Sequence, residues 1–426
     1  MDHRRSVSAH DASRVSRRLL LQVTAAGAAS SAVILAAGGR EATLAQEATP
    51  VGQGASRQFA YVGSDSRTAI AAGGNPAEAG ISVFFVAPDT GALTLVQTVP
   101  SDNAFYFAFD PTRRFLYAVN VIGDYEGKES GSVEAYAVDP ETGMLTFVNR
   151  QSSAGSTAAQ PAVDPSGRYV VVANYNGANF VVLPINPDGS LEPVVNSLEQ
   201  TGSGPNAERQ DMSHPHAVVF DPGGNYIAAA DLGTDQVLIF QLDTETGALE
   251  RVSEASTAPG AGPRHVAFSP DGTKLYVVNE MGGTITLFAF DPATGTIGEE
   301  LQTISTVPDP FEGTKSTAEI LLHPSGSFLY NSNRGQPDMV TPEGDAIVAF
   351  AIDPESGELT LVGHTTEGIA VPWSFAFDAA GQWLYAANYD DDTITQFAID
   401  QQTGALTPTG EPTTVPRPFV IMLSTP

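Results

Sequence analysis

The chain has 426 residues, no cysteine, and 20 Lys and Arg against 49 Asp and Glu, which gives a formal net charge of −29. The absence of cysteine excludes a disulfide scaffold, a cysteine nucleophile and a thiolate metal site. The acidic balance argues against a nucleic acid or an anionic membrane surface as a partner, because both are bound through Lys and Arg.

The first 45 residues form a basic segment followed by a weakly apolar stretch. Arg17 and Arg18 precede three leucines, and the residues that follow to about Ala37 are rich in Ala, Gly and Ser. This order is typical of a cleaved export signal, and the paired arginines resemble a twin-arginine signal. An uncleaved membrane anchor is the alternative. Residues 1–45 therefore predict export to the periplasm or the cell exterior, and residues 46–57 are expected to be a flexible linker.

The rest of the chain is even more acidic, with 14 basic and 46 acidic residues after position 45. No stretch in it approaches the roughly 20 apolar residues that span a bilayer. We therefore expect no integral membrane span once the signal is removed.

A strand-turn-strand unit recurs from residue 59 onward. The first copy, FAYVGS (59–64), is a second strand without its first strand, and six complete copies follow. Each has an apolar strand, a tight turn and a second strand that ends in Asn or Asp. The complete copies are FAFDPTRRFLYAVN (107–120), AVDPSGRYVVVAN (162–174), VVFDPGGNYIAAAD (218–231), VAFSPDGTKLYVVN (266–279), ILLHPSGSFLYNSN (320–333) and FAFDAAGQWLYAAN (375–388).

A second hairpin alternates with this unit, as in VEAYAVDPETGMLTFV (133–148), and its turn contains Gly. Two hairpins per repeat make a four-stranded antiparallel sheet, and the second strands end about 54 residues apart on average. Seven such sheets predict an all-β fold, a seven-bladed β-propeller over residues 58–426. No amphipathic helix is expected after the leader.

The C-terminal segment, residues 418–422 (PFVIM), has the pattern of a first strand. Because the chain begins on a second strand at 59–64, the C-terminal strand is expected to pair with it and complete the first blade. This pairing closes the ring and removes an exposed sheet edge.

In a propeller of this topology, the start of each first strand and the end of each second strand meet at one rim of the central channel. Chemically active side chains concentrate at these positions. First strands begin near Gln160, His216, Arg264, Glu319 and Trp373, and second strands end near Tyr175, Glu280, Arg334 and Tyr389. The longest connections, 65–80, 121–131, 198–213 and 334–346, lie at the same rim, where function is often found. A salt-bridge network that pairs the arginines with Glu280 or Glu319 and only holds the blades together is the alternative interpretation.

The motifs at these positions resemble a known family. GPRHVAFSPDGTKLYVVNE (262–280) with NSNRG (331–335), SHPHAVVFDP (213–222) and DLGTDQV (231–237) is similar to the seven-bladed lactonases, a family that includes bacterial 6-phosphogluconolactonases and fungal carboxy-muconate cyclases. The resemblance covers residues 57–426. One departure is Asn120-Val121, where relatives often have Asn-Glu.

The resemblance implies a catalytic set of His, Arg, Glu and Arg at the channel mouth. The matching residues are His216, Arg264, Glu280 and Arg334. His214 is the alternative histidine, because the motif reads His-Pro-His. Further substrate contacts are expected from His214, Gln160, Glu319, Trp373 and Tyr389.

Such a set suits hydrolysis of a lactone by direct attack of water. The negative charge that develops on the carbonyl oxygen needs cationic donors, which Arg264 and Arg334 supply. Water needs a general base, either Glu280 or His216. A serine acyl-enzyme is not expected, because no Gly-x-Ser-x-Gly elbow occurs in a suitable setting.

Two other functions remain open, a muconate-type cycloisomerase and a non-enzymatic extracytoplasmic binding propeller. The predicted partner is a small lactone or sugar acid, and the protein is expected to be a monomer without a cofactor. Calcium at the Asn-rich rim is the alternative to backbone capping by these asparagines. With only Arg264 and Arg334 placed at the mouth and an exported protein, a phosphorylated sugar lactone is not expected.

Overall fold

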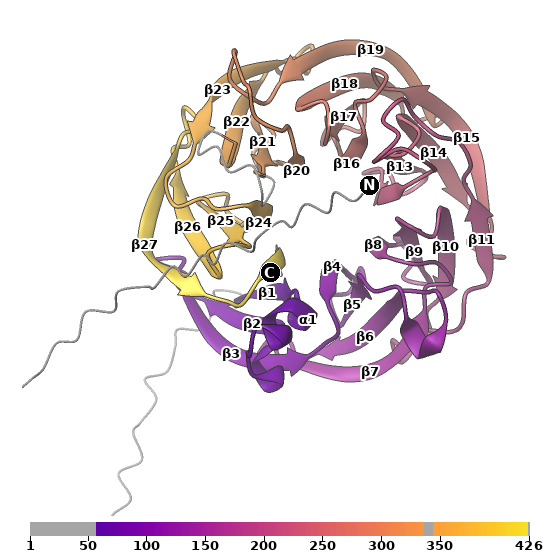
Figure 1. Cartoon of the computed structure of the whole chain (residues 1–426), viewed down its shortest axis with the longest axis vertical. Helices are drawn as coiled ribbons and strands as arrows, with labels where there is room; N and C mark the ends of the chain where they lie inside the picture. The colour runs from indigo at the N-terminus through magenta and orange to yellow at the C-terminus, as the bar shows by residue number, and fades with distance from the viewer. Residues whose placement is uncertain (1–56, 336–343, 425–426) are drawn as a thin grey trace, which may run out of the picture. The chain divides into compact units, whose positions relative to one another are not determined.

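The computed structural model describes residues 57–335 and 344–424. In these residues 28 strands form seven four-stranded antiparallel sheets, and Figure 1 shows these sheets arranged as a ring around a common axis. The innermost strands contact one another in sequence around this ring. The predicted seven-bladed β-propeller is therefore confirmed. The export signal and nearly all of the linker, residues 1–45 and 46–57, lie outside the described residues.

Each sheet is one blade, and its strands run outward from the channel. Blade 1 consists of β28 (Pro418–Leu423), β1 (Gln58–Ser64), β2 (Gly80–Val86) and β3 (Leu93–Pro100). Blade 2 consists of β4 (Ala104–Phe109), β5 (Phe115–Asn120), β6 (Ser132–Val138) and β7 (Leu145–Ser152). Blade 3 consists of β8 (Ala158–Val163), β9 (Tyr169–Asn174), β10 (Asn179–Pro184) and β11 (Asn196–Glu199). Blades 4 and 5 consist of β12 (Pro215–Phe220), β13 (Ile227–Asp231), β14 (Gln236–Leu242) and β15 (Leu249–Ser256); and β16 (Pro263–Phe268), β17 (Lys274–Asn279), β18 (Thr284–Asp291) and β19 (Thr296–Ser305). Blades 6 and 7 consist of β20 (Thr317–Leu322), β21 (Phe328–Asn333), β22 (Ala346–Ile352) and β23 (Leu359–Thr365); and β24 (Pro372–Phe377), β25 (Trp383–Asn388), β26 (Thr393–Ile399) and β27 (Leu406–Thr414).

The C-terminal strand closes the ring as predicted. Strand β28 pairs antiparallel with β1, with Tyr61 opposite Met422 and Val62 opposite Ile421. The first blade thus combines the C-terminal strand with three N-terminal strands, and both ends of the described chain are held in one sheet.

The hydrophobic core consists of seven clusters, each between two neighbouring blades. Alternate residues of one strand enter different clusters. In β5, Leu116 and Ala118 face blade 1, whereas Tyr117 and Val119 face blade 3. The middle strands are therefore buried on both faces, which explains why they are continuously apolar in sequence.

A tyrosine in the second strand of five blades joins its blade to a turn of the neighbouring one. Each hydroxyl donates to the carbonyl of a glycine with positive φ in the outer hairpin. The bonds are Tyr61–Gly143 (3.0 Å), Tyr117–Gly189 (3.1 Å), Tyr276–Gly357 (2.8 Å), Tyr330–Gly404 (2.8 Å) and Tyr385–Gly91 (2.7 Å). We call these five bonds the tyrosine links. The glycine turns thus also connect blades, in addition to reversing the chain.

The innermost strands share an irregularity at the channel mouth. In each blade the pairing with the second strand shifts register near the first residues of the innermost strand. In β16, for example, Pro263 pairs with Asn279 and His265 pairs with Val278, so Arg264 is the extra residue. Such a bulge redirects side chains and is frequent beside active sites. Here it lets consecutive residues, such as Arg264 and His265, both contribute to the channel.

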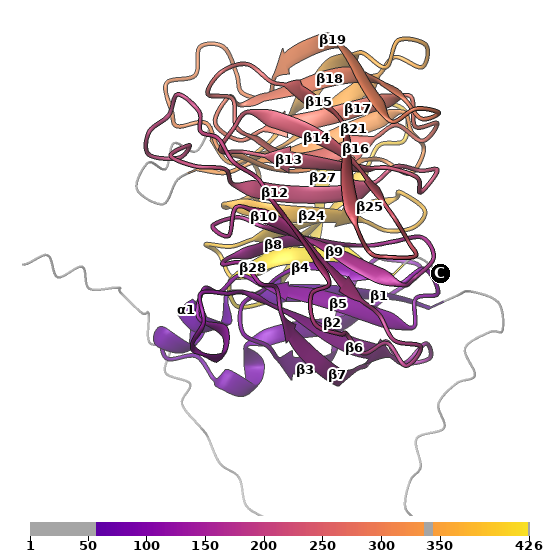
Figure 2. The same ribbon diagram turned by 90° about the vertical axis from the view of Figure 1, so that its right-hand side faces the viewer.

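The connection between β1 and β2 differs from the prediction, because it contains a short helix, α1 (Ser66–Ala71), and a turn of 3-10 helix (Pro76–Glu78). A second 3-10 turn covers Tyr125–Gly127. The Asp65 side chain caps α1 by accepting a hydrogen bond from the Thr68 amide at 3.0 Å. Figure 2 shows α1 projecting from one face of the ring. No helix in the described part of the chain is long and apolar enough to cross a membrane.

Candidate active site

The four predicted catalytic residues come from three neighbouring blades. Arg264 and His216 are the second residues of β16 and β12, and Glu280 and Arg334 directly follow β17 and β21. The Glu280 carboxylate lies 3.2 Å from Arg264 Nε and 3.1 Å from Arg334 Nη2. Arg264, Arg334 and Glu280 thus form one buried cluster at the channel mouth, as expected from their positions at strand ends of the repeat.

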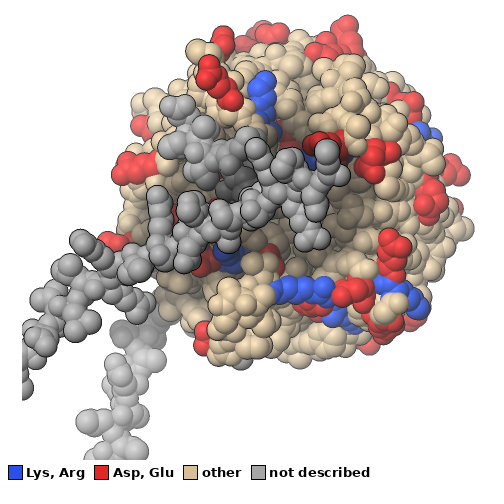
Figure 3. All heavy atoms as spheres, viewed as in Figure 1, with Lys and Arg blue, Asp and Glu red and all other residues tan. Residues whose placement is uncertain are grey.

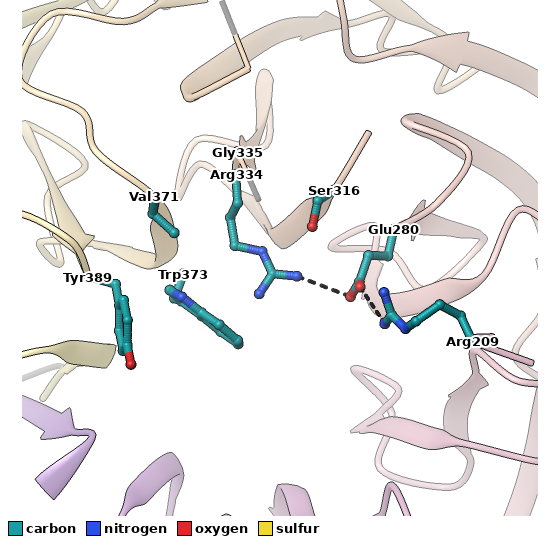
Figure 4. A pocket seen from close by; sticks show the side chains of 8 residues that line it. All are labelled: Arg209, Glu280, Ser316, Arg334, Gly335, Val371, Trp373 and Tyr389. Carbon is teal, nitrogen blue, oxygen red and sulfur yellow. Dashed lines mark hydrogen bonds and ion pairs between the residues drawn. The ribbon is translucent and has the colours of Figure 1, made fainter. Parts of the chain in front are cut away.

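A third arginine, Arg209, joins this cluster and was not predicted. Its Nη2 lies 2.7 Å from the second carboxylate oxygen of Glu280 and also donates to the Tyr175 hydroxyl at 3.3 Å. Figure 4 shows Arg209 and Arg334 approaching the Glu280 carboxylate from opposite sides. Arg209 lies on the long loop 198–213. The sequence predicts this loop at the rim, but nothing in the sequence singles out Arg209 within it. The expectation of two arginines at the mouth is therefore corrected to three.

These side chains line a cavity of about 320 Å³. One side is ionic and the other is aromatic, because Trp373 and Tyr389 form the wall opposite Arg209 (Figure 4). The Arg334 guanidinium lies 4.1 Å from the centre of the Trp373 ring, a cation–π contact that fixes both groups. The lining residues are Arg209, Glu280, Ser316, Arg334, Gly335, Val371, Trp373 and Tyr389. Of the predicted substrate contacts, Trp373 and Tyr389 belong to this cavity.

Glu280 is held as a carboxylate by its three partners. Burial raises its pKa, but the positive charges of Arg334, Arg209 and Arg264 outweigh burial and hold the pKa below its ordinary value. Both of its oxygens are engaged by guanidinium groups. A carboxylate in this state orients cations well and accepts a proton poorly.

His216 is neutral and has a free ring nitrogen. Burial first, and then the nearby charges of Arg264, His265 and Arg334, lower the pKa of His216 well below its ordinary value. Its Nδ1 is buried and has no hydrogen-bond partner among the described residues. The ring lies among aromatic groups, 5.6 Å from Tyr175 and 6.5 Å from Phe105 between ring centres. Of the two predicted bases, His216 is therefore the one with a nitrogen available to accept a proton.

Glu319 belongs to a second polar group in the channel, and it does not line the cavity. Its carboxylate accepts hydrogen bonds from the Tyr106 hydroxyl at 2.8 Å and pairs with His265 Nδ1 at 2.9 Å. Tyr106 and Glu319 come from β4 and β20, which are not neighbours, so this contact crosses the channel. Arg264 Nη1 lies 3.2 Å from His265 Nε2 and donates to the Ala318 carbonyl at 2.8 Å. The Tyr106–Glu319–His265 group therefore supports Arg264 from the side away from Glu280.

The structure places the remaining two predicted substrate contacts in other roles. His214 stacks on Tyr175 at 4.4 Å, and its ring nitrogens lie 3.1 Å from the Tyr175 carbonyl and from Asp211. Gln160 accepts a hydrogen bond from the Val218 amide at 3.0 Å in the neighbouring blade. Neither residue lines the cavity. Both side chains instead form hydrogen bonds within the protein.

The rim asparagines bind neighbouring protein groups. Asn120 donates to Ser101 and Glu134, Asn279 to Thr284 and Thr286, and Asn388 to the Gly368 carbonyl. No group of three or more His, Asp or Glu side chains suited to a metal ion occurs in residues 57–335 and 344–424. Of these bonds, those of Asn120 and Asn279 go to side chains and only that of Asn388 goes to a backbone carbonyl, so backbone capping at the rim stays a prediction.

The cluster has more positive charge than a purely structural network needs. Three guanidinium groups share the single carboxylate of Glu280, and two of them lie in a buried setting where charges are normally balanced. Buried polar atoms without a hydrogen-bond partner among the described residues also occur here, namely Arg334 Nε and Trp373 Nε1 in the cavity lining and His216 Nδ1 next to it. Unsatisfied buried polar atoms are rare in native proteins, so the two donors in the lining indicate a ligand with oxygen acceptors.

Comparison with known proteins agrees with this picture. A family described as "Lactonase, 7-bladed beta-propeller" matches residues 59–423. A 6-phosphogluconolactonase of Bacillus subtilis is 34% identical over 286 residues, which cover 67% of this chain and 77% of that protein. A 6-phosphogluconolactonase of Formosa agariphila is 29% identical over 72% of this chain and 85% of that protein. The solved periplasmic gluconolactonase of Pseudomonas aeruginosa superposes with a TM-score of 0.77 and 30% identity, over 87% of this chain and 100% of that one.

Proposed function

Since this chain belongs to the seven-bladed β-propeller lactonase family, we propose that it is a lactonase of the 6-phosphogluconolactonase type. It opens a cyclic ester to a hydroxy acid by attack of water. The observation that carries this proposal is the cavity lined by Glu280 and Arg334. Arg264, which pairs with Glu280, and the neutral His216, whose pKa is lowered by burial and by both arginines, lie next to this lining and are not part of it. The family resemblance predicted from the motifs is confirmed.

In the first step His216 accepts a proton from water, and the hydroxide forms a bond to the lactone carbonyl carbon. Negative charge then develops on the carbonyl oxygen, beside the Arg334 guanidinium that lines the cavity. Because Arg334 is held in place and only 7% of its side chain is exposed, it stabilises the oxyanion more than a donor in bulk water does. The same negative charge offsets the arginines that depress the pKa of His216, so the histidine becomes a stronger base as the oxyanion forms.

In the second step the tetrahedral intermediate collapses. The bond between the carbonyl carbon and the ring oxygen breaks, and the histidinium returns its proton to the leaving alkoxide. The product is a hydroxy acid, which is ionised at neutral pH. Glu280 remains a carboxylate throughout and keeps Arg264 and Arg334 in place.

A panel of lactones tests this function. The wild-type protein is expected to hydrolyse at least one of them, with equal rates in the presence and absence of EDTA. We expect Arg334→Ala to lower kcat by about 10²–10³-fold, as removal of an oxyanion donor does. His216→Asn is expected to lower it by about 10²–10⁴-fold, as loss of a general base does.

The controls address the alternative roles. Glu280→Gln keeps the shape but removes the charge that orders the arginines, so its activity is also expected to fall. Full activity in both Glu280→Gln and Arg334→Ala would refute the assignment. Formation of a lactone from a muconate without consumption of water would show a cycloisomerase, and loss of activity with EDTA would show a metal requirement.

We also propose that the protein acts outside the cytoplasm. Two observations support this, the twin-arginine pattern at Arg17 and Arg18 and the similarity to a gluconolactonase described as periplasmic. Replacing both arginines with lysine is expected to retain the protein in the cytoplasm, and cell fractionation with a cytoplasmic marker measures this. Unchanged fractionation would contradict the twin-arginine route.

A further inference from the structure

The three arginines around Glu280 differ in how they are held. Arg264 and Arg334 are almost completely buried, with 2% and 7% of their side chains exposed. The Arg209 side chain is 37% exposed and lines the cavity. Its residue lies on a loop, whereas Arg264 lies in β16 and Arg334 directly follows β21. Arg209 is therefore the arginine that a ligand can reach with the least rearrangement.

The loop that carries Arg209 is firmly attached next to it. The neighbouring Gln210 is buried and donates hydrogen bonds to the Leu232 carbonyl at 2.9 Å and to Asp235 at 2.7 Å. The Gln210 amide also donates to the Asn206 carbonyl at 2.7 Å. The backbone at Arg209 is thus fixed, so movement of its charge requires only side-chain rotation.

The Arg209 side chain has unused donors. Within the described residues, both side-chain hydrogen bonds of Arg209, to Tyr175 and Glu280, are donated by Nη2. If Arg209 leaves Oε1 of Glu280, the carboxylate keeps Arg264 and Arg334 as partners of its other oxygen, Oε2. A planar guanidinium binds carboxylate or phosphate oxygens through two parallel hydrogen bonds, which the free Nε and an Nη group supply.

The electrostatic balance favours an incoming anion. Burial first, and then the charges of Arg264 and Arg209, lower the pKa of Arg334 to about 10 even though Glu280 is next to it. The protonated form of Arg334 is therefore destabilised first by burial and then by repulsion from Arg264 and Arg209. An anion at the cavity relieves this repulsion, whereas a neutral ligand does not.

From these observations we infer that Arg209 is a substrate-specificity residue that turns from Glu280 to an anionic substituent of the lactone. The inference rests on the proposed lactonase function and assigns to Arg209 the recognition of a carboxylate or phosphate that lies away from the reacting ester. Arg209 recognises the negative charge of that substituent, which a carboxylate and a phosphate share. Ser316 and Trp373 complete the cavity around it.

Two matched substrate pairs test the inference. Glucono-1,5-lactone is compared with its 6-phosphate, and glucono-1,4-lactone with glucaro-1,4-lactone, so that phosphate and carboxylate are measured separately. The wild-type protein is expected to have the higher kcat/KM for the anionic member of at least one pair. Arg209→Gln is expected to reduce kcat/KM for that member by about 10–100-fold more than for the neutral member. Arg209→Lys is expected to recover part of the loss.

Arg251→Gln is the matched control. Arg251 has the same exposed fraction, 37%, and pairs with Glu254 at 2.8 Å, but it lies on the outer strand β15. It should leave both substrates unaffected. Equal loss on neutral and anionic lactones in Arg209→Gln would show a purely structural role and overturn the inference, while hydrolysis of neutral lactones would still support the proposed function.

A binding measurement separates the inference from the activity. Titration calorimetry compares gluconate with 6-phosphogluconate and glucarate, which carry an additional anionic group. Wild-type protein is expected to bind one of the latter two at least about 10-fold more tightly than gluconate, and Arg209→Gln is expected to lose this preference. Equal affinities in the wild-type protein, or a preference that persists in Arg209→Gln, would overturn the inference whether or not any lactone is hydrolysed.

Discussion

At the level of single side chains, the protonation of His216 decides the pH dependence of the proposed reaction. Its folded-state pKa lies well below the ordinary value of 6.5. The neutral base is therefore present throughout neutral and mildly acidic solution. We expect the acidic limb of the kcat/KM profile to fall below pH 6.5, because kcat/KM reports the free enzyme. A limb centred at pH 6.5 or above would contradict the role or the environment assigned to His216.

The same shift has a consequence for stability. A histidine whose pKa is depressed on folding binds protons more readily in the unfolded state. The contribution of neutral His216 is thus fully present above pH 6.5 and is lost as the pH falls toward the folded-state pKa. His265, with a pKa also lowered by burial and by Arg264, acts in the same direction. Denaturation curves between pH 7 and 5 are expected to show decreasing stability, with a smaller decrease in His216→Gln.

How far the sequence predicts the site depends on whether a residue belongs to the repeat. His216, Arg264, Glu280 and Arg334 occupy fixed places in it, so the repeat brings them to one rim. Arg209 lies in a connection without a repeat, and its position depends on hydrogen bonds such as that from Gln210 to Asp235. The roles of His214 and Gln160 could not be predicted, because they depend on hydrogen bonds to backbone groups of Tyr175 and Val218 that become neighbours only after folding.

At the level of elements, the tyrosine links explain part of the stability between blades. The Tyr276 side chain is buried, and its hydroxyl donates to the Gly357 carbonyl of the next blade at 2.8 Å. Tyr276→Phe removes the donor, so we expect it to destabilise the fold by about 1–2 kcal/mol. Urea denaturation measures the change. Tyr226→Phe is the control, because no hydrogen bond of its hydroxyl occurs in the described residues, and an equal effect of both variants would contradict the role of the link.

The closing strand β28 is expected to be indispensable. It buries Phe419, Val420, Ile421 and Leu423, and each such side chain contributes about 1.5–3 kcal/mol. Their sum is comparable with the whole stability of a typical domain, about 5–15 kcal/mol. Deletion of residues 417–426 should therefore lower Tm strongly or abolish cooperative unfolding. Deletion of residues 425–426 alone leaves β28 intact as a control, and an unchanged Tm in the longer deletion would refute the closure argument.

Most elements could be predicted from the sequence because each strand is both apolar and bounded by a turn with a clear chemical signature. In the outer hairpins, Asp139 accepts hydrogen bonds from two amides of its own turn and Gly143 adopts a positive φ of 68°. Helix α1 lacked such a signature. It spans six residues, too few for an apolar stripe, and its cap at Asp65 also accepts a hydrogen bond from the Tyr389 hydroxyl of another blade.

At the level of the whole propeller, acidic charge is spread over the surface, and three of the 14 basic residues after position 45 meet at the channel mouth. Figure 3 shows acidic side chains scattered over the outer part of the face that is viewed, with few basic ones between them. Net charge far from zero destabilises a compact state through self-repulsion. The arginine cluster, by contrast, is an attractive site for anions in an otherwise repulsive field. Salt screens both interactions. It should therefore raise the stability of the fold and weaken the binding of an anionic substrate.

We expect Tm to rise when NaCl is increased from 10 to 300 mM, by about 2 °C for each kcal/mol of repulsion that is screened. Over the same range KM for an anionic lactone should increase, because the ions screen its attraction to Arg209, while KM for the matched neutral lactone should stay constant. Calorimetry and initial rates measure the two responses on one preparation, with sucrose as a nonionic control.

A Tm that falls with NaCl would show that ion pairs such as Arg67–Asp102, 2.6 Å apart, outweigh the repulsion. An equal rise of KM for both lactones would show that salt acts on the fold and not on charge recognition at the mouth.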